Sequence, residues 1–143
     1  MGPLDGIKVI DISTIVSGPL AASMLGDQGA EVIKVEPKNG DIVRHFGFGD
    51  KGLTGTFLTV NRGKKSINLD LKSESGKEVL KKIIITADCF IQNFRPGAIE
   101  RMGFGEEEVR KIKEDIVYVS ISGFGEEGPY SKKRVYDPVI QAL

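Results

Sequence analysis

The chemistry open to this chain of 143 residues is limited first by its single cysteine and its single histidine. Cys89 has no second cysteine for a disulfide, and together with His45 it cannot supply the ligand set of a structural zinc site. Cys89 also begins a short apolar run, residues 89–91, so we interpret it as the buried thiol of a strand. A Cys–His or Ser–His catalytic pair stays open on residue counts alone, and we expect no metal site.

Basic residues form the second group that could do chemistry. Four lie near one predicted strand and three lie in loops at or beyond strand ends: Arg62, Lys64, Lys65 and Lys72, then Arg95, Arg101 and Arg134. Ligands of open parallel sheets bind beyond the carboxyl ends of the strands, where helix N-termini present free N–H groups to anions. A polyphosphate ligand fits this pattern, and loop lysines and arginines that are merely solvated fit it as well.

Two stretches match the dinucleotide fingerprint G-x-G-x-x-G, at residues 47–52 and 123–128. No apolar strand precedes the first. The second follows a strand, but Glu126 and Glu127 would place negative charge at the pyrophosphate, and no small-residue helix opens after it. Residues 62–66 resemble the end of a P-loop but lack its first glycine. We keep an NAD-dependent oxidoreductase as an alternative and expect no NAD.

The overall composition narrows the class of protein. Twenty Lys and Arg balance twenty Asp and Glu, the sequence pI is near 6.6, and 40% of the residues are hydrophobic. A nucleic-acid binder would normally carry a basic excess, so we expect no nucleic-acid partner. We see neither a run long enough to span a membrane nor a charged-then-apolar leader pattern, and we expect a cytoplasmic protein without a membrane partner.

The elements that must position these residues begin with a β-α-β pattern. Residues 7–12 are apolar and β-branched, which predicts a buried strand. Gly18 and Pro19 predict a helix start, Gly29 predicts its end, and residues 31–35 predict the next strand. Two strands joined by such a helix indicate the right-handed unit of a parallel sheet.

The remaining pattern continues this α/β alternation after one interruption. Residues 36–65 are rich in Pro, Gly and Asn and predict a long loop that could line a site. Further strands are predicted at 66–71, 88–94 and 116–121. Ser75 and Glu78 have the spacing of a capping box, which predicts the start of a helix. A helical turn is predicted at 97–102, a helix from residue 106, and a last helix with Asp137 as its N-cap. The predicted fold class is therefore α/β, a Rossmann-like parallel sheet with flanking helices.

Several segments together resemble the family III CoA-transferases, the group of formyl-CoA transferase, carnitine CoA-transferase, bile acid CoA-transferase and α-methylacyl-CoA racemase. The segments that carry the resemblance run in the family's order along essentially the whole chain. They are residues 3–11, 17–19, 29–37, 40–41, 61–67, 69–72, 93–97, 101–103, 122–125, and 136–142.

The resemblance implies that residues 1–143 are the N-terminal, CoA-binding, Rossmann-like portion of the large domain of a longer chain. By position it implies nine residues that line the site or hold CoA: Val16, Ser17, Pro19, Lys72, Asn93, Phe94, Arg101, Met102 and Arg134. Arginine and lysine suit the phosphates of CoA, which acts as substrate and product thioester, and Phe94 and Met102 offer apolar surface. Phe94 and Met102 also fit simple core positions.

Two features of the sequence depart from the family pattern and bear on the activity that we expect. The family's nucleophilic aspartate follows the Tyr136–Asp137 motif, so we expect it beyond residue 143, and we expect no catalytic residue and no activity in this chain. We also expect the small domain to lie outside these residues, and the resemblance implies an interlocked homodimer for the full-length protein. Tyr136 stands where the racemase branch has histidine, which favours CoA transfer over proton abstraction.

The resulting expectation is a CoA-transferase that moves CoA between an acyl-CoA donor and a carboxylic acid through an aspartyl intermediate. The alternatives are an acyl-CoA racemase or other CoA-thioester enzyme of the family, and a non-catalytic nucleotide-binding domain. The sequence does not name the acceptor acid.

Overall fold

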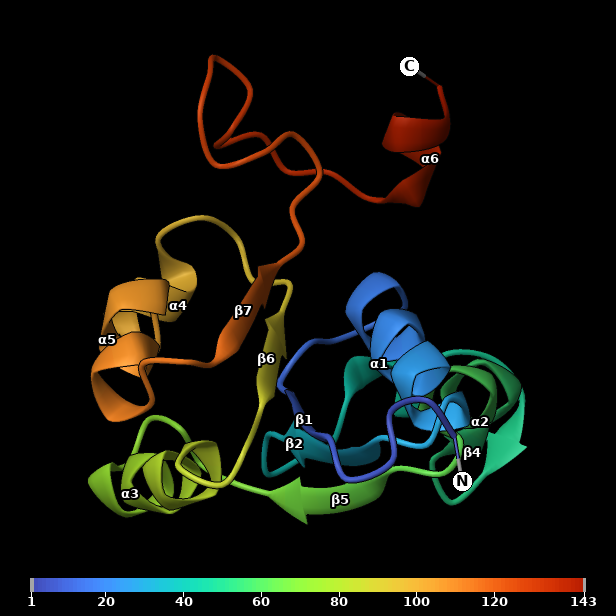
Figure 1. Cartoon of the computed structure of the whole chain (residues 1–143). Helices are drawn as coiled ribbons and strands as arrows, with labels where there is room; N and C mark the ends of the chain where they lie inside the picture. The colour runs from blue at the N-terminus through green and yellow to red at the C-terminus, as the bar shows by residue number, and fades with distance from the viewer. Residues whose placement is uncertain (1, 143) are drawn as a thin grey trace.

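The computed structural model describes residues 2–142 and has a single parallel sheet at its centre (Figure 1). Five strands pair in the order β5-β2-β1-β6-β7, and every neighbouring pair is parallel. The strands are β1 Lys8–Asp11, β2 Glu31–Glu36, β5 Lys65–Asn68, β6 Cys89–Gln92 and β7 Val117–Ser120. The predicted α/β class with a parallel sheet is confirmed.

Helices cover both faces of this sheet, because alternate residues of the central strands point to opposite sides. On one face, Val9 and Ile91 pack with Ala22 of α1 (Ser17–Asp27). On the other, Ile10 and Phe90 pack against α3 (Glu74–Ile84), α4 (Ala98–Arg101) and α5 (Glu106–Ile112). Figure 1 shows α1 and α2 on one side of the sheet and α3, α4 and α5 on the other.

The chain reverses its direction of progress across the sheet between β1 and β6. From β1 it moves outward through β2 to β5, and then it crosses back to place β6 on the other side of β1. The loops after β1 and β6 therefore diverge at the carboxyl edge. Such a switch point is where open α/β sheets bind their ligands.

Residues 36–65 differ from the predicted long loop. They form the short helix η1 (Ile42–His45), a hairpin of β3 (Gly49–Asp50) and β4 (Leu53–Thr54), and the helix α2 (Gly55–Asn61). The Thr54 hydroxyl caps α2 by accepting a hydrogen bond from the Phe57 N–H. The first G-x-G-x-x-G stretch thus lies around a hairpin. A Cβ at Gly49 would lie 2.6 Å from the Leu53 carbonyl oxygen, so close strand pairing explains that glycine.

Two predicted helix caps are wrong. The N-cap of α3 is Ser73, whose hydroxyl accepts a hydrogen bond from the Gly76 N–H, so Ser75 is not the cap. The last helix, α6 (Asp137–Gln141), has Tyr136 as N-cap, and Asp137 is its first residue. In both cases an acceptable capping residue lies close to the real boundary, and sequence spacing alone does not fix which position starts the helix.

The segment after β7 leaves the body of the molecule. Residues 121–136 contain no helix or strand, and α6 beyond them buries none of its side chains. Figure 1 shows this segment projecting from the sheet. Among the described residues, no helix combines the length and the hydropathy needed to cross a bilayer.

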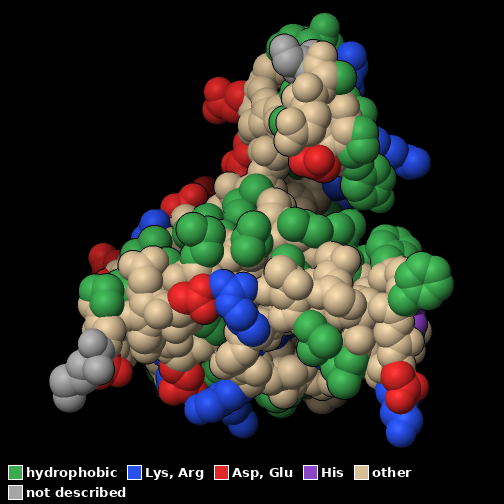
Figure 2. All heavy atoms as spheres, turned by 90° about the vertical axis from the view of Figure 1, so that its right-hand side faces the viewer, with side chains coloured by type: hydrophobic (Ala, Val, Ile, Leu, Met, Phe, Trp, Pro, Cys, Tyr) green, Lys and Arg blue, Asp and Glu red, His purple; other side chains and the backbone are tan. Residues whose placement is uncertain are grey.

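One face of the body carries several exposed apolar side chains. Figure 2 shows such side chains gathered on the side of α1, α2 and the hairpin. Exposed large hydrophobic residues of these elements are Leu20, Met24, Leu53 and Leu58.

Candidate functional site

The carboxyl edge of the sheet holds an unusual number of buried polar groups. Asp11, Glu36 and Gln92 are the last residues of β1, β2 and β6, and each is at most 2% exposed. Buried polar groups are costly unless they are paired. Their partners come both from neighbouring strands and from the loops that meet at this edge.

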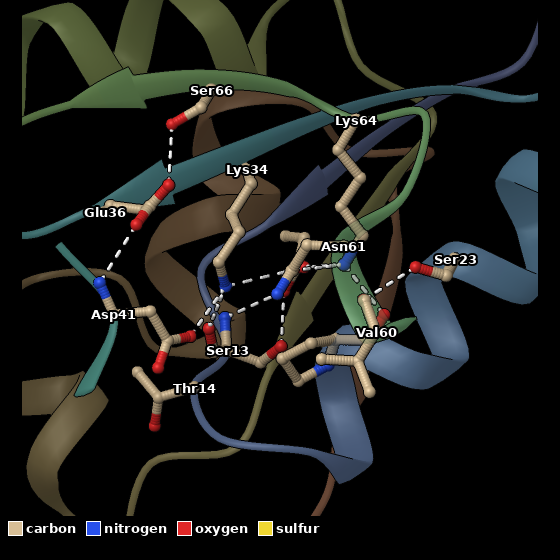
Figure 3. A network of polar contacts seen from close by, with 12 residues as sticks. Ser13, Thr14, Ser23, Lys34, Glu36, Asp41, Val60, Asn61, Lys64 and Ser66 are labelled. Atoms are coloured by element: carbon tan, nitrogen blue, oxygen red, sulfur yellow. Dashed lines mark hydrogen bonds and ion pairs between the residues drawn. The ribbon is translucent and has the colours of Figure 1, made fainter. Parts of the chain in front are cut away.

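Two lysines and two aspartates form one buried network beneath these loops (Figure 3). Lys34 on β2 places Nζ 3.0 Å from Asp41 Oδ2 and 3.9 Å from Asp11 Oδ2. Lys64 places Nζ 2.7 Å from the same Asp11 Oδ2. The side chains of all four are at most 2% exposed, and their formal charges cancel. This balance is the condition under which buried charges are tolerated.

Lys64 also ties helix α1 to this network. Its ammonium donates to the carbonyl oxygen of Pro19 at 2.7 Å and to Asn61 Oδ1 at 3.0 Å, in addition to Asp11. Burial lowers the pKa of Lys64, and the Asp11 carboxylate opposes that effect. All three ammonium protons have an acceptor, so this lysine acts as a structural cation.

A second ion pair lies beside the network. Arg44 of η1 donates to both carboxylate oxygens of Glu36, at 2.6 and 2.7 Å, and the Ser66 hydroxyl donates at 2.7 Å. Burial alone would raise the pKa of Glu36. The hydrogen bonds from Arg44, Ser66 and the Asp41 N–H outweigh it and lower that pKa to about 2. Arg44 also lies over the ring of Phe57 at 3.6 Å, a cation–π contact that fixes η1 against α2.

Asn93 joins the two loops that diverge at the switch point. Its Oδ1 accepts the Thr14 N–H at 2.8 Å and its Nδ2 donates to the Thr14 carbonyl at 2.8 Å, while Ser17 Oγ lies 3.3 Å from Nδ2. Helix α1 approaches the same loop so closely that a Cβ at Gly18 would lie 2.3 Å from Ser13 Cβ. The turn from β1 into α1 is thus held by side-chain bonds and by the absence of a side chain at residue 18.

A shallow depression of about 440 Å³ opens beside this turn. Its lining residues come from the β1–α1 loop and from the segment after β2: Thr14, Ile15, Pro37, Asn39, Gly40, Asp41, Ile42 and His45. A neighbouring depression of about 430 Å³ is more polar and includes Lys38, Arg44 and Lys51. None of the nine residues implied by the family resemblance lines either depression.

Four of those nine residues come together at the start of α1. Val16 is the N-cap of α1 and is 40% exposed, Ser17 is its first residue, and Pro19 is buried within its first turn. Asn93 reaches Ser17 from the loop after β6. These residues occupy the switch point, where the parallel-sheet argument places a ligand.

Three more lie in the segment between β6 and α5. Phe94 and Met102 are partly buried and pack against the core under α3 and α5. Arg101, the last residue of α4, is exposed. This packing agrees with the core interpretation of Phe94 and Met102, and both side chains keep part of their surface exposed.

The last two lie apart. Lys72 is exposed in the loop after the edge strand β5, and Arg134 is exposed in the irregular segment after β7. No hydrogen bond or salt bridge among residues 2–142 connects either side chain to the other seven. The structure therefore brings Val16, Ser17, Pro19 and Asn93 together and leaves Lys72 and Arg134 separate.

Three of the basic residues considered as a phosphate-binding group have carboxylate partners. Lys64 pairs with Asp11, Arg62 with Asp27, and Lys65 with Glu31. Paired cations are poor anchors for an anionic ligand. Lys64 is fully engaged in the buried network, whereas the pairs of Arg62 and Lys65 are exposed, so phosphate binding by Arg62 and Lys65 stays a prediction.

Sequence reasoning missed the buried charge network. The signal was available: Lys34 interrupts the apolar run of β2, and a lysine in such a run is buried only when it is paired. Parallel register places Asp11 opposite Lys34. Asp41 and Lys64 lie in segments predicted as loop, so nothing in the sequence indicated that they turn inward.

Cys89 is buried in β6, as predicted. Burial, with a smaller contribution from Asp88, raises its pKa to about 11. A thiol held neutral in this way is a poor nucleophile. Among residues 2–142 there is also no cluster of three or more His, Cys, Asp or Glu side chains placed to hold a metal ion.

Comparisons with known proteins agree on one family. The family model described as CoA-transferase family III matches residues 4–143. The chain is 43% identical over 145 residues to an acetyl-CoA:oxalate CoA-transferase of Acetobacter aceti, covering 99% of the chain and 37% of that protein. It is 42% identical over 143 residues to the human succinyl-CoA:glutarate CoA-transferase, covering 99% of the chain and 33% of that protein.

Solved structures give the same result at the level of the fold. A CAIB/BAIF family protein from Brucella suis superposes with a TM-score of 0.93 at 38% identity, over 99% of this chain and 39% of that one. The protein Rv3272 from Mycobacterium tuberculosis superposes with a TM-score of 0.90 at 37% identity, over 99% and 38%. The chain thus spans little more than a third of the length of the relatives it matches, and it belongs to CoA-transferase family III.

Proposed function

We propose that this chain is the CoA-binding part of an enzyme that moves CoA from an acyl-CoA donor to a small dicarboxylic acid. The observation that carries the proposal is the family match over residues 4–143, together with a switch-point site at the carboxyl edge. Three similar proteins are named for transfer to oxalate or glutarate, which supports a dicarboxylate as acceptor.

The residues at the edge suit CoA as a ligand. CoA carries a pyrophosphate and a 3′-phosphate, and charge-assisted bonds from arginine or lysine are the strong way to hold them. Lys72, Arg101 and Arg134 are exposed, and within residues 2–142 none of them forms a salt bridge. In the proposal these cations hold the phosphates, Phe94 and Met102 contact the apolar part, and Val16, Ser17, Pro19 and Asn93 line the turn near the thioester.

The chemical step in this proposal uses an aspartate outside these 143 residues. Its carboxylate attacks the acyl carbon of the donor, the C–S bond breaks, and CoA leaves as a thiolate. The thiolate then attacks the aspartyl carbonyl of the mixed anhydride, which releases the donor acid and leaves an aspartyl-CoA thioester. The acceptor carboxylate repeats the sequence in reverse. Each step transfers an acyl group between two nucleophiles, so neither oxidant nor reductant is consumed.

Tyr136 favours transfer over racemisation. Proton abstraction beside a thioester needs a base, and the position that holds a histidine in the racemase branch is a tyrosine here. A racemase remains the second candidate within the same family.

We also propose that residues 1–143 are the N-terminal portion of the large domain, completed by further chain and by a second, interlocked subunit. The exposed apolar residues Leu20, Met24, Leu53 and Leu58 support this part of the proposal. Contiguous apolar surface on a soluble protein is commonly covered in its working state.

The test is a transfer assay on two polypeptides, this chain and a version continued to the length of its relatives. Each is incubated with acetyl-CoA, formyl-CoA or succinyl-CoA and with oxalate or glutarate, and thioesters are separated by chromatography. We expect a new dicarboxylyl-CoA only with the longer polypeptide. CoA transfer by the 143-residue chain would refute a nucleophile outside it. In a parallel assay, each polypeptide is incubated with a branched acyl-CoA and proton exchange at its α-carbon is measured. Proton exchange by the longer polypeptide without any CoA transfer would favour the racemase.

A further inference from the structure

The turn between β1 and α1 contains a backbone conformation that its residue disfavours. Ile15 has φ of 69°, in the left-handed region. A β-branched side chain clashes with its own backbone there, and such residues persist only when their surroundings hold them. Ile15 lines the 440 Å³ depression and directly precedes Val16 and Ser17, two of the residues proposed to face the substrate.

The surroundings hold this turn through three successive residues. The Ser13 N–H donates to Asp11 at 3.0 Å, and its carbonyl accepts from Lys34 at 2.9 Å. Thr14 is bound at both its N–H and its carbonyl by the Asn93 side chain. The strained residue itself has a single side-chain partner, Asp41.

Asp41 is placed for this contact by the buried charge network. Its Oδ1 accepts the Ile15 N–H at 3.3 Å and the Val43 N–H at 3.1 Å. Its Oδ2 has no hydrogen bond of good geometry and is balanced by the Lys34 ammonium 3.0 Å away. Lys34 donates to Ser13 as well, so one cation fixes both the aspartate and the start of the turn it holds.

We propose that Asp41 is a positioning residue that holds Ile15 in the left-handed conformation and thereby orients Val16 and Ser17 toward the bound CoA thioester. The effect on CoA rests on the proposed function, whereas the effect on Ile15 does not. Without Asp41, Ile15 relaxes to an ordinary conformation and the first turn of α1 is presented differently. A glycine at residue 15 visits the left-handed region freely, so it needs the aspartate much less.

A double-substitution cycle tests this coupling. The variants are Asp41→Ala, Ile15→Gly and their combination, and each is examined by NMR couplings and carbon shifts that report φ at residue 15, and by calorimetric titration with CoA. We expect Asp41→Ala to abolish the left-handed signature and to weaken CoA binding by about tenfold. In the Ile15→Gly background we expect the same substitution to weaken binding by about twofold or less.

Two further variants separate positioning from loss of stability. Asp41→Asn keeps an acceptor for the Ile15 N–H, so we expect it to retain the left-handed signature and most of the affinity for CoA. This variant also tests the proposal if Asp41→Ala proves too unstable to purify. Thr54→Val removes two nearby buried hydrogen bonds, from Thr54 Oγ1 to the Val43 carbonyl at 2.7 Å and from the Phe57 N–H to Thr54 Oγ1 at 3.2 Å, and neither involves the turn. We expect it to lower the thermal midpoint while residue 15 and the affinity stay unchanged.

The proposal is overturned if Ile15 stays left-handed in Asp41→Ala, or if Asp41→Asn loses the left-handed signature as fully as Asp41→Ala does. It is also overturned if Asp41→Ala weakens CoA binding by the same factor whether residue 15 is isoleucine or glycine. A chain that binds no CoA in its unsubstituted form would refute CoA binding by this segment, and with it the orienting effect. The NMR result would still decide whether Asp41 holds Ile15.

Discussion

Lys64 and Lys65 are neighbours in the sequence, yet their ammonium groups lie in opposite environments. The Lys64 side chain is 2% exposed and pairs with Asp11, whereas the Lys65 side chain is 71% exposed and pairs with Glu31. Removing one partner of a buried pair leaves an uncompensated charge, but exposed pairs contribute little.

We therefore expect Lys64→Met to lower the free energy of unfolding by about 3 kcal/mol, because Asp11 loses its closest cation. Lys65→Met is the matched control and should be nearly neutral. Urea denaturation at pH 7 measures both. A loss for Lys64→Met as small as that for Lys65→Met would contradict the stabilising role of the Asp11 network.

The Glu36 carboxylate makes the free energy of unfolding depend on pH in the acidic range. Its pKa is about 2 in the folded protein against 4.5 for the free group. A carboxylate with a depressed pKa contributes fully above its unfolded value, and the contribution is lost as the pH falls from 4.5 toward 2. The shift corresponds to on the order of 3 kcal/mol.

We expect the stability gap between the wild type and Glu36→Gln to be large at pH 7 and to shrink steadily below pH 4.5. Denaturant titrations at pH 7, 4 and 3 measure it. Glu31→Gln, at an exposed pair, should show a small gap throughout. A Glu36→Gln gap that does not change with pH would contradict the assigned role of the ion pair with Arg44.

At the scale of the elements, the entry into α1 depends on a glycine with no room for a side chain. Gly18→Ala would place Cβ 2.3 Å from Ser13, whose backbone is fixed by Asp11 and Lys34. We expect a loss of about 2 kcal/mol from overpacking. Gly55→Ala, at the start of α2, meets no atom within 4 Å and should be neutral or slightly stabilising. Thermal unfolding compares them, and similar effects would show that α1 can shift away from the turn.

The start of α3 gives a second comparison between elements. Because Ser73 caps the helix, Ser73→Ala should cost about 1 kcal/mol, and Ser75→Ala should cost much less. Chemical denaturation of the two variants decides between the observed cap and the one that sequence spacing predicts. A larger loss for Ser75→Ala would restore the predicted boundary.

Local sequence signals predicted the regular elements well, and inward-turning loops poorly. Apolar runs marked β1, β2 and β6, because parallel strands that are buried on both faces are built largely from apolar residues. The excursion between β2 and β5 was predicted as a long loop, because η1 and the β3–β4 hairpin are too short for a periodic pattern. Asp41 lies in that excursion, so its burial follows from tertiary contacts that sequence periodicity does not encode.

At the scale of the whole molecule, the sheet order places the candidate site before any side chain is considered. The order β5-β2-β1-β6-β7 fixes the switch point between β1 and β6, and Asn93 closes it against the β1 loop. The family resemblance selected four residues around this point. The resemblance also selected Lys72 and Arg134, which do not lie at this switch point in the structure. A CoA molecule that contacted all nine residues would therefore extend well beyond the start of α1.

The central claim, that this carboxyl edge binds CoA, is tested most directly by calorimetric titration of the 143-residue chain at low ionic strength with CoA, dephospho-CoA and NAD. We predict saturable binding of CoA, weaker binding of dephospho-CoA because it lacks the 3′-phosphate, and none of NAD. Arg101→Ala and Lys72→Ala should each weaken CoA binding by about tenfold. Arg110→Ala, at an exposed arginine paired with Glu106 on α5, should leave it unchanged. Absence of saturable CoA binding, or equal binding of CoA and NAD, would contradict the claim.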